Sequence, residues 1–122
     1  MQRILVIDDD EQIRALLGQI LERAGYQVAE ASNGSAGLTA FRAQPADLVI
    51  TDLIMPEQEG IETMLALRRE FPNTRVMAIS GGGKNNSRDY LPIARQLGAC
   101  CTLAKPFSRQ EILHAVQQAL AP

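Results

Sequence analysis

Short apolar runs of strand length recur along the chain, separated by segments of a different pattern. Residues 4–7, 48–50 and 76–79 are continuously apolar. Continuous hydrophobicity over a few residues is typical of a strand covered on both faces, as in a parallel sheet. Residues 27–31 alternate and predict a more exposed edge strand, while residues 100–103 predict a weaker, last strand.

The segments between these strands carry helical periodicity. In the first segment, apolar residues recur at i, i+3, i+4, i+7 and i+8, which predicts one stripe along a helix. This stripe consists of Ile13, Leu16, Leu17, Ile20 and Leu21. Gly25 then supplies a natural stop for the helix.

Four more helices are predicted further along the chain. Three of them are marked by residues 36–42 before Pro45, by Ile61, Met64, Leu65 and Leu67 before Pro72, and by Ile93, Ala94 and Leu97 before Gly98. The last opens at Ser108 and Glu111, which have the spacing of a capping box. Its predicted apolar stripe is Ile112, Val116 and Ala119.

Strand and helix therefore alternate five times. Right-handed crossovers then give a five-stranded parallel sheet with helices on both faces. The predicted class is α/β, a flavodoxin-like (βα)5 doubly wound sheet with strand order 2-1-3-4-5. Residues 1–122 are expected to form a single domain.

Composition and charge narrow the class of protein further. The net charge is −2, with 12 basic and 14 acidic residues interspersed, so no basic surface is offered to nucleic acid or to an anionic membrane. The apolar runs are too short to span a bilayer, and the N-terminus lacks a signal-peptide pattern. We therefore expect a cytoplasmic protein that binds neither nucleic acid nor membranes directly.

The two cysteines, Cys100 and Cys101, are adjacent. Neighbouring residues of a strand point to opposite faces, so a disulfide between them would be strained. We expect both to be small apolar residues in a reducing compartment rather than a redox switch or a metal site.

Polar residues follow four of the five predicted strands. Asp8 and Asp9 follow the first, Asp52 the third, Ser80 the fourth and Lys105 the fifth. Ligands of open α/β sheets bind beyond the carboxyl ends of the strands, where these side chains should converge. Each residue alone is commonly a cap or turn residue. Their joint placement at successive strand ends points to a shared site.

These residue types suit phosphoryl transfer assisted by a metal. Clustered carboxylates repel one another unless a cation neutralises them, and Mg²⁺ prefers oxygen ligands and bridges to phosphate. Lys105 and Ser80 can each bind one phosphoryl oxygen, since this chemistry is mostly positioning and charge neutralisation. Asp8 and Asp9 are neighbours suited to holding the metal. Asp52 stands alone on the central strand and is the predicted nucleophile.

At this point the sequence resembles the receiver domain of two-component response regulators, the CheY-like superfamily. The motifs that carry the resemblance are residues 4–9, residues 52–56, Ser80 and residues 105–107, and it covers essentially the whole chain. The resemblance implies a phosphorylation-dependent switch that catalyses only its own phosphorylation and dephosphorylation.

The resemblance also implies roles for single residues. Asp52 is the phosphoacceptor and a metal ligand, Asp9 binds Mg²⁺ directly, and Asp8 acts through metal-bound water. The backbone carbonyl of Ile54 completes the protein ligands. Ser80 and Lys105 bind the phosphoryl oxygens.

Two further expectations concern residues that are close to this site in the sequence. The resemblance implies a cis peptide bond before Pro106. Asp10 is expected to be solvated at a helix start, where negative charge is favourable.

The family's partners are sensor histidine kinases or histidine phosphotransfer proteins, which donate the phosphoryl group. An unknown downstream protein is expected at the face formed by the fourth helix, the fifth strand and the fifth helix. His114 is expected on the surface of the last helix, and residues 90–92 are expected to form an exposed apolar spot near the fourth.

The chain departs from the family pattern in three places. Thr102 stands where receivers carry an aromatic switch residue, which leaves the output mechanism open. Ile54 and Gly82 occupy positions that tune hydrolysis and offer no polar side chain, which predicts slow loss of phosphate. Residues 81–87 are glycine-rich but lack the P-loop spacing, because Ala78 and Asn85 stand where Gly and Ser or Thr are required. They predict a loop that orders on phosphorylation.

Two alternative hypotheses remain. An Asp-nucleophile phosphatase would need a second acid two residues after Asp52, where Ile54 stands. A degenerate receiver that serves only as an interaction module would lack some of the five site residues, all of which are present. The chain itself is expected to be a stand-alone protein or the N-terminal part of a longer one.

Overall fold

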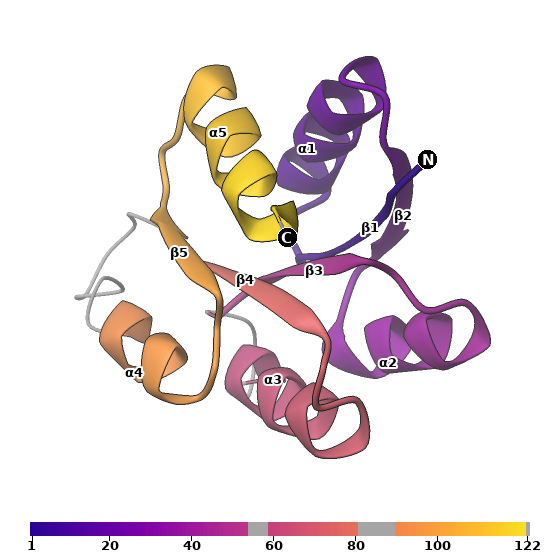
Figure 1. Ribbon diagram of the computed structural model, residues 1–122, viewed down its shortest axis with the longest axis vertical. Helices are drawn as coiled ribbons and strands as arrows, with labels where there is room; N and C mark the ends of the chain where they lie inside the picture. The colour runs from indigo at the N-terminus through magenta and orange to yellow at the C-terminus, as the bar shows by residue number, and fades with distance from the viewer. Residues whose placement is uncertain (54–58, 81–89, 122) are drawn as a thin grey trace.

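A five-stranded parallel sheet forms the centre of the computed structural model, which describes residues 1–53, 59–80 and 90–121 (Figure 1). Its strands are β1 (Arg3–Ile7), β2 (Gln27–Ala31), β3 (Leu48–Asp52), β4 (Arg75–Ser80) and β5 (Cys101–Ala104). The strand order is β2-β1-β3-β4-β5 and every pair is parallel, which confirms the predicted topology.

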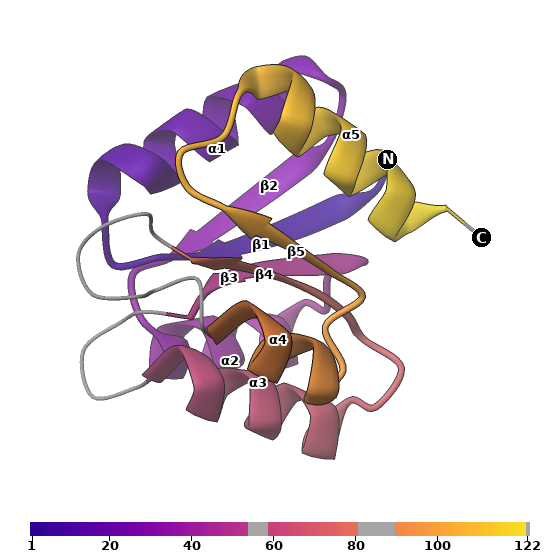
Figure 2. The ribbon, with the colours of Figure 1, turned by 90° about the vertical axis from the view of Figure 1, so that its left-hand side faces the viewer.

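Within the described residues, five helices cover the two faces of the sheet. They are α1 (Glu11–Arg23), α2 (Gly34–Ala43), α3 (Glu59–Glu70), α4 (Tyr90–Gln96) and α5 (Arg109–Leu120). α1 and α5 lie on one face, and α2, α3 and α4 lie on the other (Figures 1 and 2). The arrangement is the doubly wound one expected from alternating strands and helices.

The buried hydrophobic residues form two clusters, one on each face of the sheet. The cluster under α1 and α5 includes Leu17, Leu21, Ile112 and Val116, and the cluster under α2 and α3 includes Phe41, Met64 and Leu67. The central strands contribute to both, because alternate residues of each strand point to opposite faces. β1, β3 and β4 are buried almost throughout, as their continuous hydrophobicity predicted.

Caps and glycines set the helix boundaries. Ser108 and Glu111 form the predicted capping box, in which the Glu111 N–H donates to Ser108 Oγ at 3.0 Å and the Ser108 N–H donates to Glu111 Oε1 at 2.8 Å. Asp10 is exposed and caps α1 by accepting from the Gln12 and Ile13 N–H groups. Gly25 follows α1 with a φ of 98°, a left-handed conformation that favours glycine.

Several details differ from the predicted pattern. Leu16 is 44% exposed and Leu65 is 46% exposed, although both are among the apolar residues that marked α1 and α3. Helical periodicity identifies a helix but does not define which of its apolar residues the sheet covers. β5 begins at Cys101 rather than at residue 100, and α2 begins at Gly34 because Asn33 caps it.

The part of the chain that the structure describes contains no helix of the length and apolarity that crossing a lipid bilayer requires.

Candidate functional site

The polar residues predicted at the strand ends meet at one edge of the sheet. Asp8 follows β1, Asp52 ends β3, Ser80 ends β4 and Lys105 follows β5. All strands are parallel, so these ends lie on the same side, toward the left of Figure 2. The strand register places these ends at similar heights along the edge, since Asp52 pairs with Ile79 and Ser80 pairs with Ala104.

Asp8 is fully buried and each of its polar groups has a defined role. Its N–H donates to the Ala31 carbonyl at 3.2 Å and extends the β1–β2 ladder by one residue. Its Oδ1 accepts from the Asp10 N–H at 2.9 Å, which orients the carboxylate. The second oxygen, Oδ2, faces the ammonium group of Lys105.

Lys105 joins the first strand to the third. Its Nζ lies 3.0 Å from Asp8 Oδ2 and 3.1 Å from Asp52 Oδ2, and its side chain is 15% exposed. Burial alone would lower the pKa of Lys105, but the carboxylates of Asp52 and Asp8 raise it above the usual value for lysine. The ammonium group is therefore charged at neutral pH.

Asp9 completes a cluster of three carboxylates. Oxygens of Asp8, Asp9 and Asp52 lie within 4.8 Å of one another, with Asp9 exposed and the other two buried. Partial burial and the charge of Asp8 raise the pKa of Asp9 above its usual value. Among the described residues, Lys105 supplies the ammonium group that contacts these carboxylates, and one ammonium group leaves the cluster with excess negative charge. Three oxygen donors with that excess fit a hard divalent cation such as Mg²⁺.

Ser80 is also buried at this edge, as the last residue of β4. Its carbonyl accepts from the Lys105 N–H at 2.8 Å, which fixes the start of the segment that carries the lysine. The peptide bond between Lys105 and Pro106 is cis, the geometry that the resemblance implied. The structure thus brings all five predicted side chains to one end of the sheet.

Thr102 lies within β5 and is half-buried. Its Oγ1 accepts a long hydrogen bond of 3.4 Å from Arg95 Nε of α4. The position that departs from the family pattern is therefore in polar contact with the neighbouring helix.

Some predicted features fall outside the described residues. Ile54, Gly82 and the rest of the glycine-rich segment 81–87 are among them, and so are the side chains of Tyr90 and Leu91. His114 is exposed on α5, as predicted. Arg14, for which no role was predicted, donates to the Asp8 carbonyl. Its spacing of three residues from Leu17 places it on the flank of the apolar stripe, and this was the available signal.

Both cysteines are free thiols. Cys100 precedes β5 and is exposed, while Cys101 is half-buried and its Sγ lies 4.0 Å from the Ala115 carbonyl. A hydrogen bond from Cys101 lowers the pKa of Cys100 to about 7 and raises that of Cys101.

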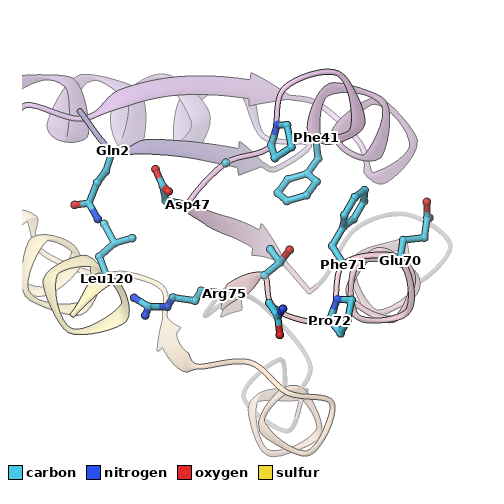
Figure 3. Close-up of a pocket in the computed structure, with 12 residues that line it drawn as sticks. Gln2, Phe41, Asp47, Glu70, Phe71, Pro72, Arg75 and Leu120 are labelled. Atoms are coloured by element: carbon cyan, nitrogen blue, oxygen red, sulfur yellow. The ribbon is translucent and has the colours of Figure 1, made fainter. Parts of the chain in front are cut away.

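A pocket of about 710 Å³ lies at the opposite end of the sheet, lined in part by Phe41, Phe71, Asp47 and Arg75 (Figure 3). The rings of Phe41 and Phe71 pack against each other with centroids 4.7 Å apart. The charged groups already have partners: Asp47 accepts from the Arg3 N–H at 2.8 Å, and Arg75 donates to the Ala119 carbonyl at 2.9 Å. This pocket is therefore a structural depression, remote from the carboxylate cluster.

Comparison with known proteins agrees with this geometry. The family model for the response regulator receiver domain matches residues 4–117. Sporulation initiation phosphotransferase F of Bacillus subtilis is 34% identical over 119 residues, covering 98% of this chain and 94% of the relative. The response regulator receiver protein CpdR of Brucella abortus is 31% identical over 123 residues and 98% of both chains.

Solved structures lead to the same family. A response regulator receiver domain protein from Clostridium thermocellum is 31% identical, with a TM-score of 0.88 over 98% of this chain and 94% of that one. Sequence and structure thus agree along nearly the full length, and the chain belongs to the response regulator receiver domain family of two-component phosphorelay signalling.

Proposed function

We propose that residues 1–122 form one receiver domain that accepts a phosphoryl group on Asp52 with the help of Mg²⁺. The observation that carries this proposal is the position of Lys105 Nζ, 3.1 Å from Asp52 Oδ2, beside a cluster of three carboxylates. A charged ammonium at that distance can neutralise an oxygen of an incoming phosphoryl group.

Each residue then has a part in the transfer. An oxygen of Asp52 forms a bond to phosphorus while the bond from phosphorus to the donor's imidazole nitrogen breaks, which gives an acyl phosphate. Lys105 neutralises one phosphoryl oxygen, and the Ser80 hydroxyl donates to another. Because Lys105 holds Asp8 and Asp52 in the resting site, the incoming phosphoryl group would share or replace those contacts.

The metal would be held by the acidic cluster. Asp9 and Asp52 would supply direct carboxylate ligands, Asp8 would act through a bound water, and the backbone carbonyl of Ile54 would complete the set. When bound, Mg²⁺ would neutralise charge on the third phosphoryl oxygen. The protein would catalyse only its own phosphorylation and dephosphorylation. Loss of phosphate would be slow, because neither Ile54 nor Gly82 can orient water with a polar side chain.

The donor would be a sensor histidine kinase or a histidine phosphotransfer protein in the cytoplasm. An apolar pocket of about 310 Å³ adjoins the site and is lined by Ile13, Leu16, Lys105, Pro106 and Phe107. Leu16 is 44% exposed, and a donor that presents a histidine to Asp52 must approach close to this pocket. The donor would therefore bury it on docking.

The downstream signal would leave through the face formed by α4, β5 and α5. Thr102 takes the place of the family's aromatic switch there, and its hydrogen bond to Arg95 connects β5 to α4. A change at Lys105 or Ser80 on phosphorylation would reach this contact along β4 and β5. The partner would be a protein rather than nucleic acid or a membrane, in line with the mixed charge of the chain.

Incubation with acetyl phosphate and Mg²⁺, followed by intact-mass measurement, tests the proposal. One added phosphoryl group is expected, and it should be absent in D52N and in EDTA. Transfer from a phosphorylated histidine donor should slow in L16D while labelling by acetyl phosphate persists. Absence of any adduct with either donor would refute the switch. An Asp-nucleophile phosphatase would instead turn over phosphate esters, which the chain is expected not to hydrolyse.

A further inference from the structure

Arg14 lies on α1 directly beside the acidic end of β1. Its Nη1 donates a 2.7 Å hydrogen bond to the backbone carbonyl of Asp8, and its side chain is only 17% exposed. Asp10 caps the same helix, so the start of α1 is fixed relative to the strand end. The Asp8 carbonyl belongs to the peptide unit that joins Asp8 to Asp9.

That carbonyl lies where the β1–β2 ladder ends. The Asp8 N–H still bonds to Ala31, but the chain then leaves the strand to enter α1. Asp8 is fully buried, and a buried carbonyl without a partner is costly. A hydrogen bond from a guanidinium to this oxygen satisfies it and holds the plane of the peptide unit.

Arg14 also forms an ion pair with a neighbour on β2. Its Nε lies 3.7 Å from Glu30 Oε1. Gly18, one turn further along α1, leaves room for Glu30, because a Cβ at this position would lie 3.0 Å from Glu30 Oε2. The guanidinium contacts the acidic end of β1 through its hydrogen bond to the Asp8 backbone, and besides burial the pKa of Asp9 is shifted by the charges of Asp8 and Lys105.

We propose that Arg14 is a positioning residue for the metal site. By fixing the peptide plane between Asp8 and Asp9, it sets the angle at which the two carboxylates face a bound cation. This inference rests on the proposed function, in which Mg²⁺ is held by Asp8, Asp9 and Asp52. Groups that orient metal ligands in this way commonly change metal affinity by about 10–100-fold when they are removed.

The test compares R14M with R14K and with two controls. R14M keeps the apolar stem and removes every donor, whereas R14K keeps the charge and one donor group. E30Q removes the ion pair but leaves the bond to Asp8. R42M removes an arginine on α2 that pairs with Glu70 at 2.7 Å, away from the acidic cluster.

Two measurements separate positioning from general stability. Thermal unfolding in EDTA first gives a temperature at which every variant is folded. The Mg²⁺ dissociation constant is then measured by calorimetry at that temperature. The amide resonance of Asp9 is compared by NMR without metal. R14M is expected to raise the Mg²⁺ dissociation constant about 10-fold or more and to shift the Asp9 amide. R14K should recover most of the affinity, and E30Q and R42M should leave both readouts near those of the unaltered protein.

Two outcomes would overturn the inference in distinguishable ways. If the unaltered protein binds Mg²⁺ and R14M binds it equally well, Arg14 does not position the site, while the proposed function stands. If the unaltered protein binds no Mg²⁺, the metal part of the proposed function fails and the inference fails with it. Should R14M not fold, R14Q replaces it, because the shorter amide does not reach the Asp8 carbonyl, and the same results are expected.

Discussion

The ammonium group of Lys105 lies between Asp8 and Asp52, 3.0 Å and 3.1 Å from a carboxylate oxygen of each. A residue that follows the edge strand β5 thereby joins the ends of two strands at the centre of the sheet. This contact holds the acidic cluster together without metal, and a phosphoryl group on Asp52 would compete for the same ammonium.

Replacing Lys105 should therefore destabilise the metal-free protein. K105M leaves two buried carboxylates without their shared partner, and the expected loss is about 1–3 kcal/mol of unfolding free energy in EDTA. Because the pKa of Lys105 is raised, its contribution is complete at neutral pH and is lost only as pH rises above the usual range of lysine. Urea unfolding at neutral pH measures the loss. Equal stability of K105M and the unaltered protein would contradict the proposed role of this contact.

Asp9 should have the opposite effect on stability. Its pKa is raised in the folded protein, so its ionised form disfavours folding at neutral pH, and stability is gained as pH falls through that pKa. D9N should therefore melt above the unaltered protein in EDTA. Mg²⁺ at a hundredfold excess over its dissociation constant should add about 2.7 kcal/mol to the unaltered protein and much less to D9N. Thermal melts with and without Mg²⁺ provide the comparison, and an equal Mg²⁺ increment in D9N would rule out Asp9 as a ligand.

Gly60 should be needed for the position of Asp52. A Cβ on Gly60 would collide with the Asp52 carbonyl and lie 2.6 Å from Leu53 Cα, and both are backbone atoms. G60A should displace the end of β3, destabilise the protein by about 1–3 kcal/mol and slow labelling by acetyl phosphate.

G25A is the matched control for Gly60. Gly25 has a φ of 98° and open space around it, so alanine there should cost about 1–2 kcal/mol through backbone strain alone. Its labelling rate per folded molecule should not change. Equal labelling rates in G60A and G25A would show that close packing on β3 does not position Asp52.

The capping box at the start of α5 allows a test of the fold that leaves the site intact. S108A removes the side-chain acceptor of the Glu111 N–H and should cost about 1 kcal/mol of unfolding free energy. In a double-mutant cycle with E111A, the two substitutions should be non-additive because the caps are reciprocal. Additive losses in urea unfolding would mean that the two hydrogen bonds act independently.

Cys100 should react with alkylating reagents near neutral pH. The pKa of its thiol is lowered to about 7, chiefly by the hydrogen bond from Cys101. The rate of reaction with iodoacetamide should therefore be half-maximal at a higher pH in C101A, which removes the donor, than in the unaltered protein. C101S keeps a donor, because a hydroxyl donates more strongly than a thiol, and its midpoint should stay below that of C101A. Mass spectrometry after timed quenching gives the rates, and a midpoint unchanged by C101A would argue against the contact between the two thiols.

Much of the fold follows from local pattern. The continuous apolar runs marked the three buried strands, and the alternation of residues 27–31 marked the edge strand. The spacing of Ser108 and Glu111 marked the start of α5. These signals are reliable because burial on both faces and capping each require particular residue types within a few positions.

The sequence alone predicted which side chains gather at this edge of the sheet. Asp8, Asp9, Asp52, Ser80 and Lys105 each follow a predicted strand, and parallel strands bring their carboxyl ends to one edge of the sheet. Only the tertiary structure decided how these groups contact one another, because distances between residues far apart in sequence depend on strand register and on the packing of the helices. The bridge from Lys105 to two carboxylates, the bond from Arg14 to the Asp8 carbonyl and the exposure of Leu16 are set by those contacts, and no local pattern encodes them.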